Sequence, residues 1–305
     1  MNAINFKYFC TFISLVIIST LTCSNGASQI TADEFLKIGS WNIQNLGDRH
    51  YGQDPKALAE HIQLAGVDIL ALQEIHDTDE NSDTRTSVKL DQLFGLLNQH
   101  PEFDYEYALF SNRDSRDTAR ICGIAWNRRK VSTNGKPYRI PVKYENAQTW
   151  KRHPHAMKFS CGSGKSDIII ISVHMKSNHN VQGLPEPAEI RRAEAKALSD
   201  AFDSVRDHFK DDDIVITGDT NCLHNNEPAL QIYYDSGFYD LNRKDAETYR
   251  DEKAPFDRIF VPKNESEFKF SRQYILSPAD PGKHTSKLSD HYMVLAMIRI
   301  MEDDD

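Results

Sequence analysis

Short apolar runs alternate with amphipathic stretches along most of the chain. Apolar runs of four to nine residues predict strands at residues 36–41, 69–72, 105–110, 121–126, 156–159, 168–173, 214–217, 258–261 and 292–300. Apolar residues spaced three and four apart predict helices at residues 55–65, 87–97, 186–205 and 227–235. Because both kinds of element interleave from about residue 28 to residue 301, the sequence predicts one α/β or α+β domain.

The N-terminal residues follow a different pattern. Lys7 precedes an apolar run over residues 9–21, and the small and polar residues 24–27 follow it. This order is typical of a secretory signal peptide, and it predicts a secreted or periplasmic protein. A membrane anchor is the alternative, but the run is shorter than the roughly 20 residues that span a bilayer. We therefore predict a signal peptide at residues 1–26 and one domain at residues 27–305, ending in a short acidic tail.

Polar residues stand at one end of several predicted strands. They are Asn42, Gln73, Glu74, His174, Asp219, Asn221, Asp290 and His291. If these strands lie side by side, the polar side chains converge at one rim of a sheet. A single polar residue at a strand end is common in turns. Five such groups in one chain, at residues 42, 73–74, 174, 219–221 and 290–291, indicate a functional site.

The oxygen-bearing side chains of this group indicate a site for a hard divalent cation. Mg²⁺ is usually held by one or two carboxylates, while water and substrate phosphate complete its shell. Glu74 and Asp290 supply carboxylates, and Asn42, Asp219 and Asn221 are expected near them. We expect Mg²⁺ as the cofactor, with Mn²⁺ or Ca²⁺ as alternatives.

Two histidines of the group can transfer protons near neutral pH. They are His174 and His291, and a carboxylate on a histidine's second nitrogen fixes its tautomer and raises its basicity. Asp257 is the candidate partner of His291. Four further histidines are expected to be structural or exposed: His153, His155, His179 and His284.

Charge changes the picture in one segment. The net charge of the chain is −9, so its overall field does not attract nucleic acid. Between residues 113 and 158, however, twelve lysines and arginines are opposed by three carboxylates, which gives a local charge near +9. This stretch is a candidate surface for a polyanion, and a solvated basic face is the alternative.

Other classes of protein are not supported by motif or composition. A hydrophobic content of 39% is that of an ordinary globular protein. The sequence contains no GxSxG elbow, P-loop or GxGxxG motif. Cys122, Cys161 and Cys222 allow at most one disulfide, and a Cys161–Cys222 pair and three unpaired thiols both stay open.

The sequence resembles the endonuclease/exonuclease/phosphatase superfamily through seven blocks in the family's order. They are SWNIQNLG (40–47), ILALQEI (69–75), RHPHAMKF (152–159), ISVHMKS (171–177), GDTN (218–221), FDRIF (256–260) and LSDHYMV (288–294). The deoxyribonuclease I-like branch is most similar, because His174 ends the strand before GDTN and Arg152 begins an R-x-P block. The resemblance implies an α+β fold, a four-layer α/β/β/α sandwich of two mostly antiparallel sheets flanked by helices.

The resemblance also implies roles at the metal and the phosphate. Asn42, Glu74 and Asp290 would hold or orient the metal ion. Asp219 and Asn221 would position the metal ion and the scissile phosphate. All five residues come from blocks that match the family's order.

For proton transfer, the resemblance implies a pair of histidines. Asp257 would orient His291, His174 would be its partner in acid/base catalysis, and Arg152 would bind a phosphate oxygen. The branch also has a tyrosine and a carboxylate that orients the first histidine. The corresponding segment of this chain has no tyrosine, and Asp117 is its candidate carboxylate.

Together these features predict a secreted divalent-metal-dependent phosphodiesterase, most simply an endonuclease that hydrolyses DNA with two histidines. The alternative is a phospholipase C-type sphingomyelinase or a phosphatase of phosphoinositides or small phosphate esters. RNA and phospholipid are less favoured substrates than DNA, and we expect neither a stable protein partner nor an integral membrane protein. Aromatic residues on a basic groove would favour nucleic acid, whereas an exposed aromatic hairpin would favour lipid.

Overall fold

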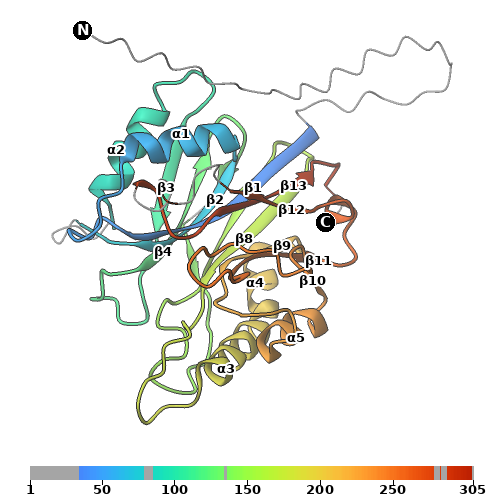
Figure 1. Ribbon diagram of the computed structural model, residues 1–305. Coiled ribbons are helices and arrows are strands. Elements are labelled where there is room, and N and C mark those ends of the chain that lie inside the picture. Colours follow the sequence, from blue (N-terminus) through green and yellow to red (C-terminus); the bar gives the residue numbers. More distant parts are fainter. Residues whose placement is uncertain (1–33, 79–84, 134–135, 278–281, 283–286, 304–305) are drawn as a thin grey trace, which may run out of the picture. The chain divides into compact units, whose positions relative to one another are not determined.

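The predicted strands assemble into two sheets in the computed structural model (Figure 1). The structure describes residues 34–78, 85–133, 136–277, 282 and 287–303, so the predicted signal peptide and His284 lie outside the described residues. The first sheet has the order β12-β13-β1-β2-β4-β3, formed by Gln273–Leu276, Met293–Arg299, Phe35–Leu46, Ile69–Ile75, Ile121–Asn127 and Tyr105–Leu109.

The second sheet has the order β10-β11-β9-β8-β7-β5, with β6 also paired to β7. These strands are Phe238–Asp240, Asp257–Pro262, Ile214–Asp219, Asp167–His174, His155–Ser160, Ser132–Thr133 and Tyr138–Arg139. The pairs β1–β2 and β8–β9 are parallel, and the other pairs in both sheets are antiparallel. The prediction of two mostly antiparallel sheets is confirmed.

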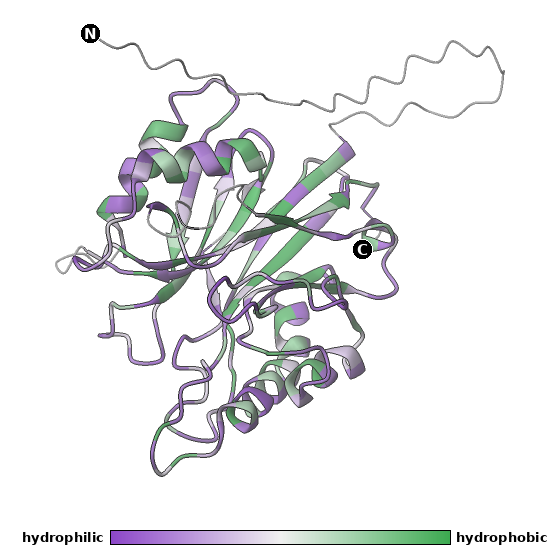
Figure 2. Cartoon of the chain, viewed as in Figure 1, coloured by the Kyte–Doolittle hydropathy of each residue, from purple (hydrophilic) through white to green (hydrophobic). Residues whose placement is uncertain are grey.

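Three apolar cores separate four layers. One core lies between the two sheets and includes Ile38, Ile170 and Ile259. A second joins the first sheet to α1 (Pro55–Ala65) and α2 (Val88–Leu97), and a third joins the second sheet to the remaining helices. Figure 2 accordingly shows mainly apolar strands and mainly hydrophilic loops. The predicted α/β/β/α sandwich is therefore confirmed.

Local capping explains where α1 begins and ends. The Asp54 side chain accepts a hydrogen bond from the Lys56 amide (3.0 Å), and Pro55 occupies the first turn. Gly66 ends the helix in a left-handed conformation (φ 59°) and donates its amide hydrogen to the Ile62 carbonyl. The predicted bounds of 55–65 are confirmed.

The predicted helix at residues 186–205 is two helices. α3 (Pro187–Ser199) ends at Asp200, and α4 (Phe202–Phe209) begins after Ala201. Buried residues continue at helical spacing across the break, from Ile190 to Val205, so periodicity alone could not locate it. α5 (Pro228–Asp235) packs beside α3.

Four short strands and one 3-10 helix were not predicted. The strands are β5, β6, β10 and β12, which have two to four residues each. The 3-10 helix η2 (Ser266–Phe268) precedes β12. Segments this short carry too few alternations to reveal a strand period.

The cysteines and helices settle two further points. Cys122, Cys161 and Cys222 are all free, so the alternative of three unpaired thiols holds and the Cys161–Cys222 pair is wrong. Among the described residues, no helix combines the length and the apolarity that crossing a membrane requires.

Substituting Arg258 is expected to test the buried charge network of the second sheet. Its guanidinium contacts Asp240 (2.5 Å) and Asp245 (2.5 Å), and neither Arg258 nor Asp240 has exposed side-chain area. Arg258→Ala would leave a buried carboxylate unpaired, so we expect a loss of about 3–5 kcal/mol in the free energy of unfolding, measured by urea denaturation. Arg116→Ala, in a pair with Asp114 that is mostly exposed, is the control and should leave it nearly unchanged. Equal losses in both variants would contradict this role.

Candidate active site

Strand pairing brings the polar strand ends together. Asn42 and Glu74 lie toward the C-terminal end of the parallel pair β1–β2. His174 and Asp219 lie opposite each other at the C-terminal end of the parallel pair β8–β9. Asp257 begins β11 directly opposite Asp219. His291 precedes β13, which runs antiparallel to β1. The predicted convergence at one rim therefore occurs, although the rim belongs to both sheets.

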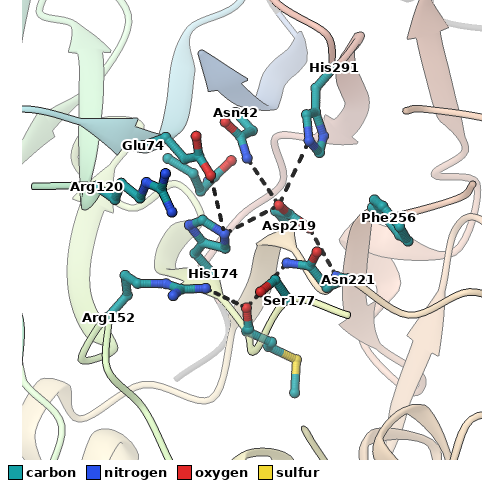
Figure 3. Close-up of polar contacts among 12 residues, drawn as sticks. Asn42, Glu74, Arg120, Arg152, His174, Ser177, Asp219, Asn221, Phe256 and His291 are labelled. Atoms are coloured by element: carbon teal, nitrogen blue, oxygen red, sulfur yellow. Dashed lines mark hydrogen bonds and ion pairs between the residues drawn. The ribbon is translucent and has the colours of Figure 1, made fainter. Parts of the chain in front are cut away.

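These side chains line an open cavity of about 440 Å³. Its lining comprises Gln44, Asn45, Tyr51, Glu74, Arg120, His174, Ser177, Asn178, His179, Asp219, Asn221, Tyr249, Glu252, Phe256, Asp290 and His291. Figure 3 shows several of them turned toward Asp219, which lies at the centre of the group. Glu74, His174, Asp219, Asn221, Asp290 and His291 were predicted from the sequence.

The backbone at the rim is unusually strained. Nine described residues other than glycine have positive φ, and five of them line the cavity: Gln44, Asn45, Glu74, Arg120 and Asn221. Such conformations cost free energy and concentrate at functional sites. Gly218 is equally constrained, because at its φ of 151° a Cβ would lie 1.9 Å from the Val173 carbonyl oxygen. This close approach of β9 to β8 sets the position of Asp219.

Two hydrogen-bond donors hold the Asp219 carboxylate, and two histidines lie close to it. Its Oδ1 accepts the Asn221 amide hydrogen (2.9 Å) and its Oδ2 accepts the Asn42 side-chain amide (3.0 Å). The Nε2 atoms of His174 and His291 lie 3.4 Å and 3.9 Å from the same Oδ2. Because the Asn42 Oδ1 accepts the Gln44 amide hydrogen, the predicted metal residue Asn42 orients Asp219 here.

Glu74 and Asp290 face the cavity from the first sheet. Glu74 accepts the Asn45 amide hydrogen (3.1 Å), and Asp290 accepts from the Gln44 side-chain amide (2.8 Å). Burial raises the pKa of Asp290 above its ordinary value and raises that of Asp219 to about 6. Three carboxylates in one partly desolvated cavity thus carry negative charge that a divalent cation would stabilise, so the residues fit the predicted metal ion.

A second acidic group lies at the other end of β9. Asp213, Glu265 and Glu267 have carboxylate oxygens within 4.8 Å of one another. Glu267 accepts a hydrogen bond from Ser166 (3.4 Å). This group is separated from Asp219 by the length of the strand, so it is not part of the cavity.

His291 has the predicted partner. Its Nδ1 lies 2.8 Å from the Asp257 Oδ2, and Asp257 is fully buried. Burial alone would lower the pKa of His291, but Asp257, Asp219 and Asp290 together raise it to about 10. Asp257 therefore fixes the ring orientation and keeps Nε2 toward the cavity.

His174 is held differently. Its Nδ1 is buried without a hydrogen-bond partner, and its Nε2 faces Asp219 (3.4 Å) and Glu74 (3.8 Å). Burial and the charge of Arg152 lower its pKa well below the ordinary value. The candidate carboxylate Asp117 is exposed and accepts the Ala119 amide hydrogen, so no carboxylate of the described residues orients His174 from Nδ1.

The two arginines nearest the site point in different directions (Figure 3). Arg152, predicted to bind phosphate, donates to the Met175 carbonyl (2.6 Å) and does not line the cavity. The Asn221 side-chain amide donates to the same carbonyl (3.2 Å). Arg120 lines the cavity, and its Nε donates to the Asn45 Oδ1 (2.7 Å). Arg120 carries no motif of its own, and only its place in the basic stretch marked it.

The basic stretch of residues 113–158 is not one cationic face. Several of its members have carboxylate or carbonyl partners: Arg113 with Asn146, Arg116 with Asp114, Arg128 with Asp104 and Glu106, and Lys158 with Asp167 and Asp211. Of the stretch, Arg120 alone lines the cavity described above. Four of the twelve basic residues thus have partners within the protein, which argues against one continuous surface for a polyanion.

His153 and His155 are structural, as expected, but both are buried. The His153 Nε2 donates to the Ile140 carbonyl (2.8 Å), the His155 Nδ1 donates to the His153 carbonyl (3.0 Å), and His155 stacks on Phe110. Burial lowers the pKa of His153 to about 3 and that of His155 to about 4.

These two pKa values predict a loss of stability in acid. Both rings stay neutral in the folded state but take a proton near pH 6.5 when unfolded. Stability should be complete above pH 6.5 and fall toward pH 4, by up to about 1.4 kcal/mol per pH unit for each histidine. The double variant His153→Gln, His155→Asn keeps both donors, so its unfolding free energy between pH 6.5 and 4 should have a shallower slope. An unchanged slope would contradict the assignment.

Comparison with known proteins agrees with this arrangement. Residues 39–291 match the model of the Endonuclease/Exonuclease/phosphatase family. The chain is 26% identical to mouse (Mus musculus) deoxyribonuclease-1-like 2 over 235 residues, which cover 74% of this chain and 76% of that protein. The fold is similar to an endonuclease/exonuclease/phosphatase family protein from Bacteroides thetaiotaomicron (TM-score 0.62, 16% identity, 88% and 95% of the two chains). It is also similar to the human Nocturnin catalytic domain with a bound sulfate anion (TM-score 0.58, 16% identity, 88% and 95%). Because this family model matches most of its length, the chain belongs to the Endonuclease/Exonuclease/phosphatase family.

Proposed function

We propose that this protein is a secreted, divalent-cation-dependent phosphodiesterase that hydrolyses DNA internally. The observation that carries the proposal is the Asp257–His291 pair, which faces the carboxylates of Glu74, Asp219 and Asp290 across one open cavity. The similarity to a protein named deoxyribonuclease-1-like 2 supports the nuclease class. Secretion rests on the signal-peptide pattern of residues 1–26.

In the proposed reaction, a divalent cation and two histidines have different roles. Glu74 and Asp290, with Asp219 behind them, would hold Mg²⁺. When bound, this cation would stabilise negative charge on the phosphate oxygens and lower the pKa of a water molecule. His291, oriented by Asp257, would carry a proton to or from the attacking or leaving oxygen. His174 is its predicted partner in acid/base catalysis and directs Nε2 at the same point.

Asn221 and Arg120 supply further hydrogen-bond donors for phosphate oxygens. Asn221 lines the cavity beside Asp219, and the Arg120 guanidinium projects from the start of β4. An arginine binds phosphate through a planar, always-charged fork of donors. In this arrangement Arg152 has a supporting role, because it holds the segment that follows His174 through the Met175 carbonyl.

Arg120→Ala is expected to raise the KM for DNA by about tenfold or more, because a charge-assisted hydrogen bond to phosphate is lost. Arg116→Ala is a matched control on the same loop, since Arg116 is exposed and lies outside the cavity. Steady-state kinetics with a fluorescent oligonucleotide measure both variants. If Arg152→Ala raised KM and Arg120→Ala did not, the sequence-based assignment of Arg152 would be restored.

The proposed function is tested with the purified mature protein and supercoiled plasmid in Mg²⁺, with and without chelator. Nicking that the chelator abolishes would support an endonuclease. Sphingomyelin vesicles and a small phosphate monoester are assayed in parallel. Release of phosphocholine or phosphate without nicking would refute the nuclease and move the same residues to a phospholipase C-type or phosphatase reaction.

A further inference from the structure

A groove with aromatic walls lies where the edges of the two sheets meet. β10 is the edge strand of the second sheet and β12 is the edge strand of the first. Tyr239 on β10, Tyr274 on β12 and Phe270 just before β12 line the groove, whose volume is about 580 Å³. Val261 and Phe268, both almost fully buried, are part of the same lining.

The three aromatic side chains are unusually accessible. Phe270 is 79% exposed, Tyr274 51% and Tyr239 43%. A phenylalanine this exposed gains little from the protein's own core, so its position is not explained by packing. Two of the rings come from the edge strands of different sheets and the third from the segment before β12, and all three line one hollow.

The charge of the groove is opposite to that of the whole chain. Three cationic residues line it, Lys263, Lys269 and Arg272, and its lining contains no carboxylate. All three are exposed, and the Lys269 ammonium lies 5.9 Å from the centre of the Phe270 ring. In a chain with a net charge of −9, such a local surplus of positive charge favours an anionic ligand.

We propose that this groove binds single-stranded nucleic acid at a second site, outside the catalytic cavity. The proposal rests on the proposed function, since it makes the groove a binding site for the substrate polymer. Bases stack on aromatic side chains regardless of sequence, and lysine and arginine follow the phosphates. A hollow that three aromatic rings and three cationic side chains line together suits the bases and the phosphates of one nucleic-acid strand.

The groove and the catalytic cavity are connected by β11. Asp257 begins this strand at the cavity, and Pro262 ends it at the groove. Five residue steps at about 3.3 Å separate the two ends by roughly 17 Å. A long nucleic-acid strand can therefore contact both the groove and the cavity, whereas a substrate with one phosphodiester cannot. The groove should strengthen binding of long strands and leave the chemistry at the cavity unchanged.

The binding test uses the full mature protein with chelator and a labelled 20-nucleotide single-stranded oligothymidylate, followed by fluorescence anisotropy. Phe270→Ala with Tyr274→Ala should weaken binding at least tenfold, because the double variant removes two rings on which bases stack. The logarithm of the association constant falls as the logarithm of the salt concentration rises. In Lys269→Ala with Arg272→Ala the magnitude of this slope should be smaller by about 1.4, or about 0.7 for each phosphate contact. Leu64→Ala and Lys210→Ala, both exposed and outside the groove lining, are the matched controls.

Two further arms separate the possible failures. Hydrolysis of bis(4-nitrophenyl) phosphate in Mg²⁺ should be equal in the wild type and in the groove variants, while KM for a long single strand rises about tenfold in the variants. If the wild type does not bind the oligonucleotide, or if the aromatic variants bind it equally well, the groove proposal is wrong. Binding of phosphatidylserine vesicles in place of the oligonucleotide would also overturn it. Absence of any hydrolysis by the wild type would instead refute the proposed function, because the binding result does not depend on turnover.

Discussion

His291→Ala is expected to lower kcat for plasmid nicking by about 10²–10⁴-fold, which is the usual contribution of a positioned acid or base. The structure gives His291 one fixed orientation, since its Nδ1 is bound by the buried Asp257 at 2.8 Å and its backbone amide donates to Ser289. Asp257→Asn should lower kcat for the same reason, because an amide does not select the same tautomer of the ring.

The control for this prediction is His100→Ala, which changes a histidine outside the cavity. Its kcat should stay within about twofold of the wild type, and circular dichroism should show that all three variants are folded. His174→Ala is measured beside them. Near-normal turnover in both His174→Ala and His291→Ala would exclude a mechanism in which these two histidines transfer the protons.

Much of the site followed from the sequence because strand ends are visible in it. Apolar runs end where strands end, so Glu74, His174 and Asp219 could be placed near strand ends without knowing the strand order. Asn42 lies where the regular pairing of β1 with β2 stops, although the strand itself continues to Leu46. Parallel pairing of β1 with β2 and of β8 with β9 then brings these ends together. Asp257 was assigned to His291 by motif, and the antiparallel register of β11 with β9 explains why it lies there.

The direction of a side chain was harder to predict than the position of its residue. Arg152 and Arg120 both belong to the basic stretch. Arg120 has a left-handed backbone conformation (φ 54°), and its side chain lines the cavity. Arg152 instead points to the Met175 carbonyl. Residues other than glycine rarely adopt such conformations, and neither hydrophobic periodicity nor composition reveals them.

The same reason explains why Gln44 and Asn45 were missed. Their backbone φ angles of 38° and 55° accompany an irregularity within β1. The Gln44 side-chain amide donates to Asp290, and the Asn45 backbone amide donates to Glu74. Both residues lie in the block at residues 40–47, but hydrophobic periodicity predicted only a strand that runs into Asn42. The groove between β10 and β12 was missed for another reason, because both of its strands are too short to show a period.

Removing a carboxylate of the cavity should separate stability from activity. Burial raises the pKa of Asp290 above its ordinary value, so the ionised side chain is unfavourable in the folded protein when no cation is bound. Asp290→Asn replaces it with a neutral side chain that can still accept from Gln44. In chelator, this variant should therefore melt at the same temperature as the wild type or higher.

In Mg²⁺ the order should reverse. A ligand that binds only the folded state raises its melting temperature by mass action, so the wild type should gain stability as Mg²⁺ increases while Asp290→Asn gains little. Its kcat for plasmid nicking should fall by about 10²–10³-fold or more, because several kcal/mol of charge stabilisation at the phosphate are lost. Asp203→Asn, at a residue that is 93% exposed, is the control and should match the wild type in both measurements. An equal rise in melting temperature in the wild type and Asp290→Asn would show that the cation is held elsewhere. In that case the desolvated carboxylates of the cavity would need an explanation other than metal binding.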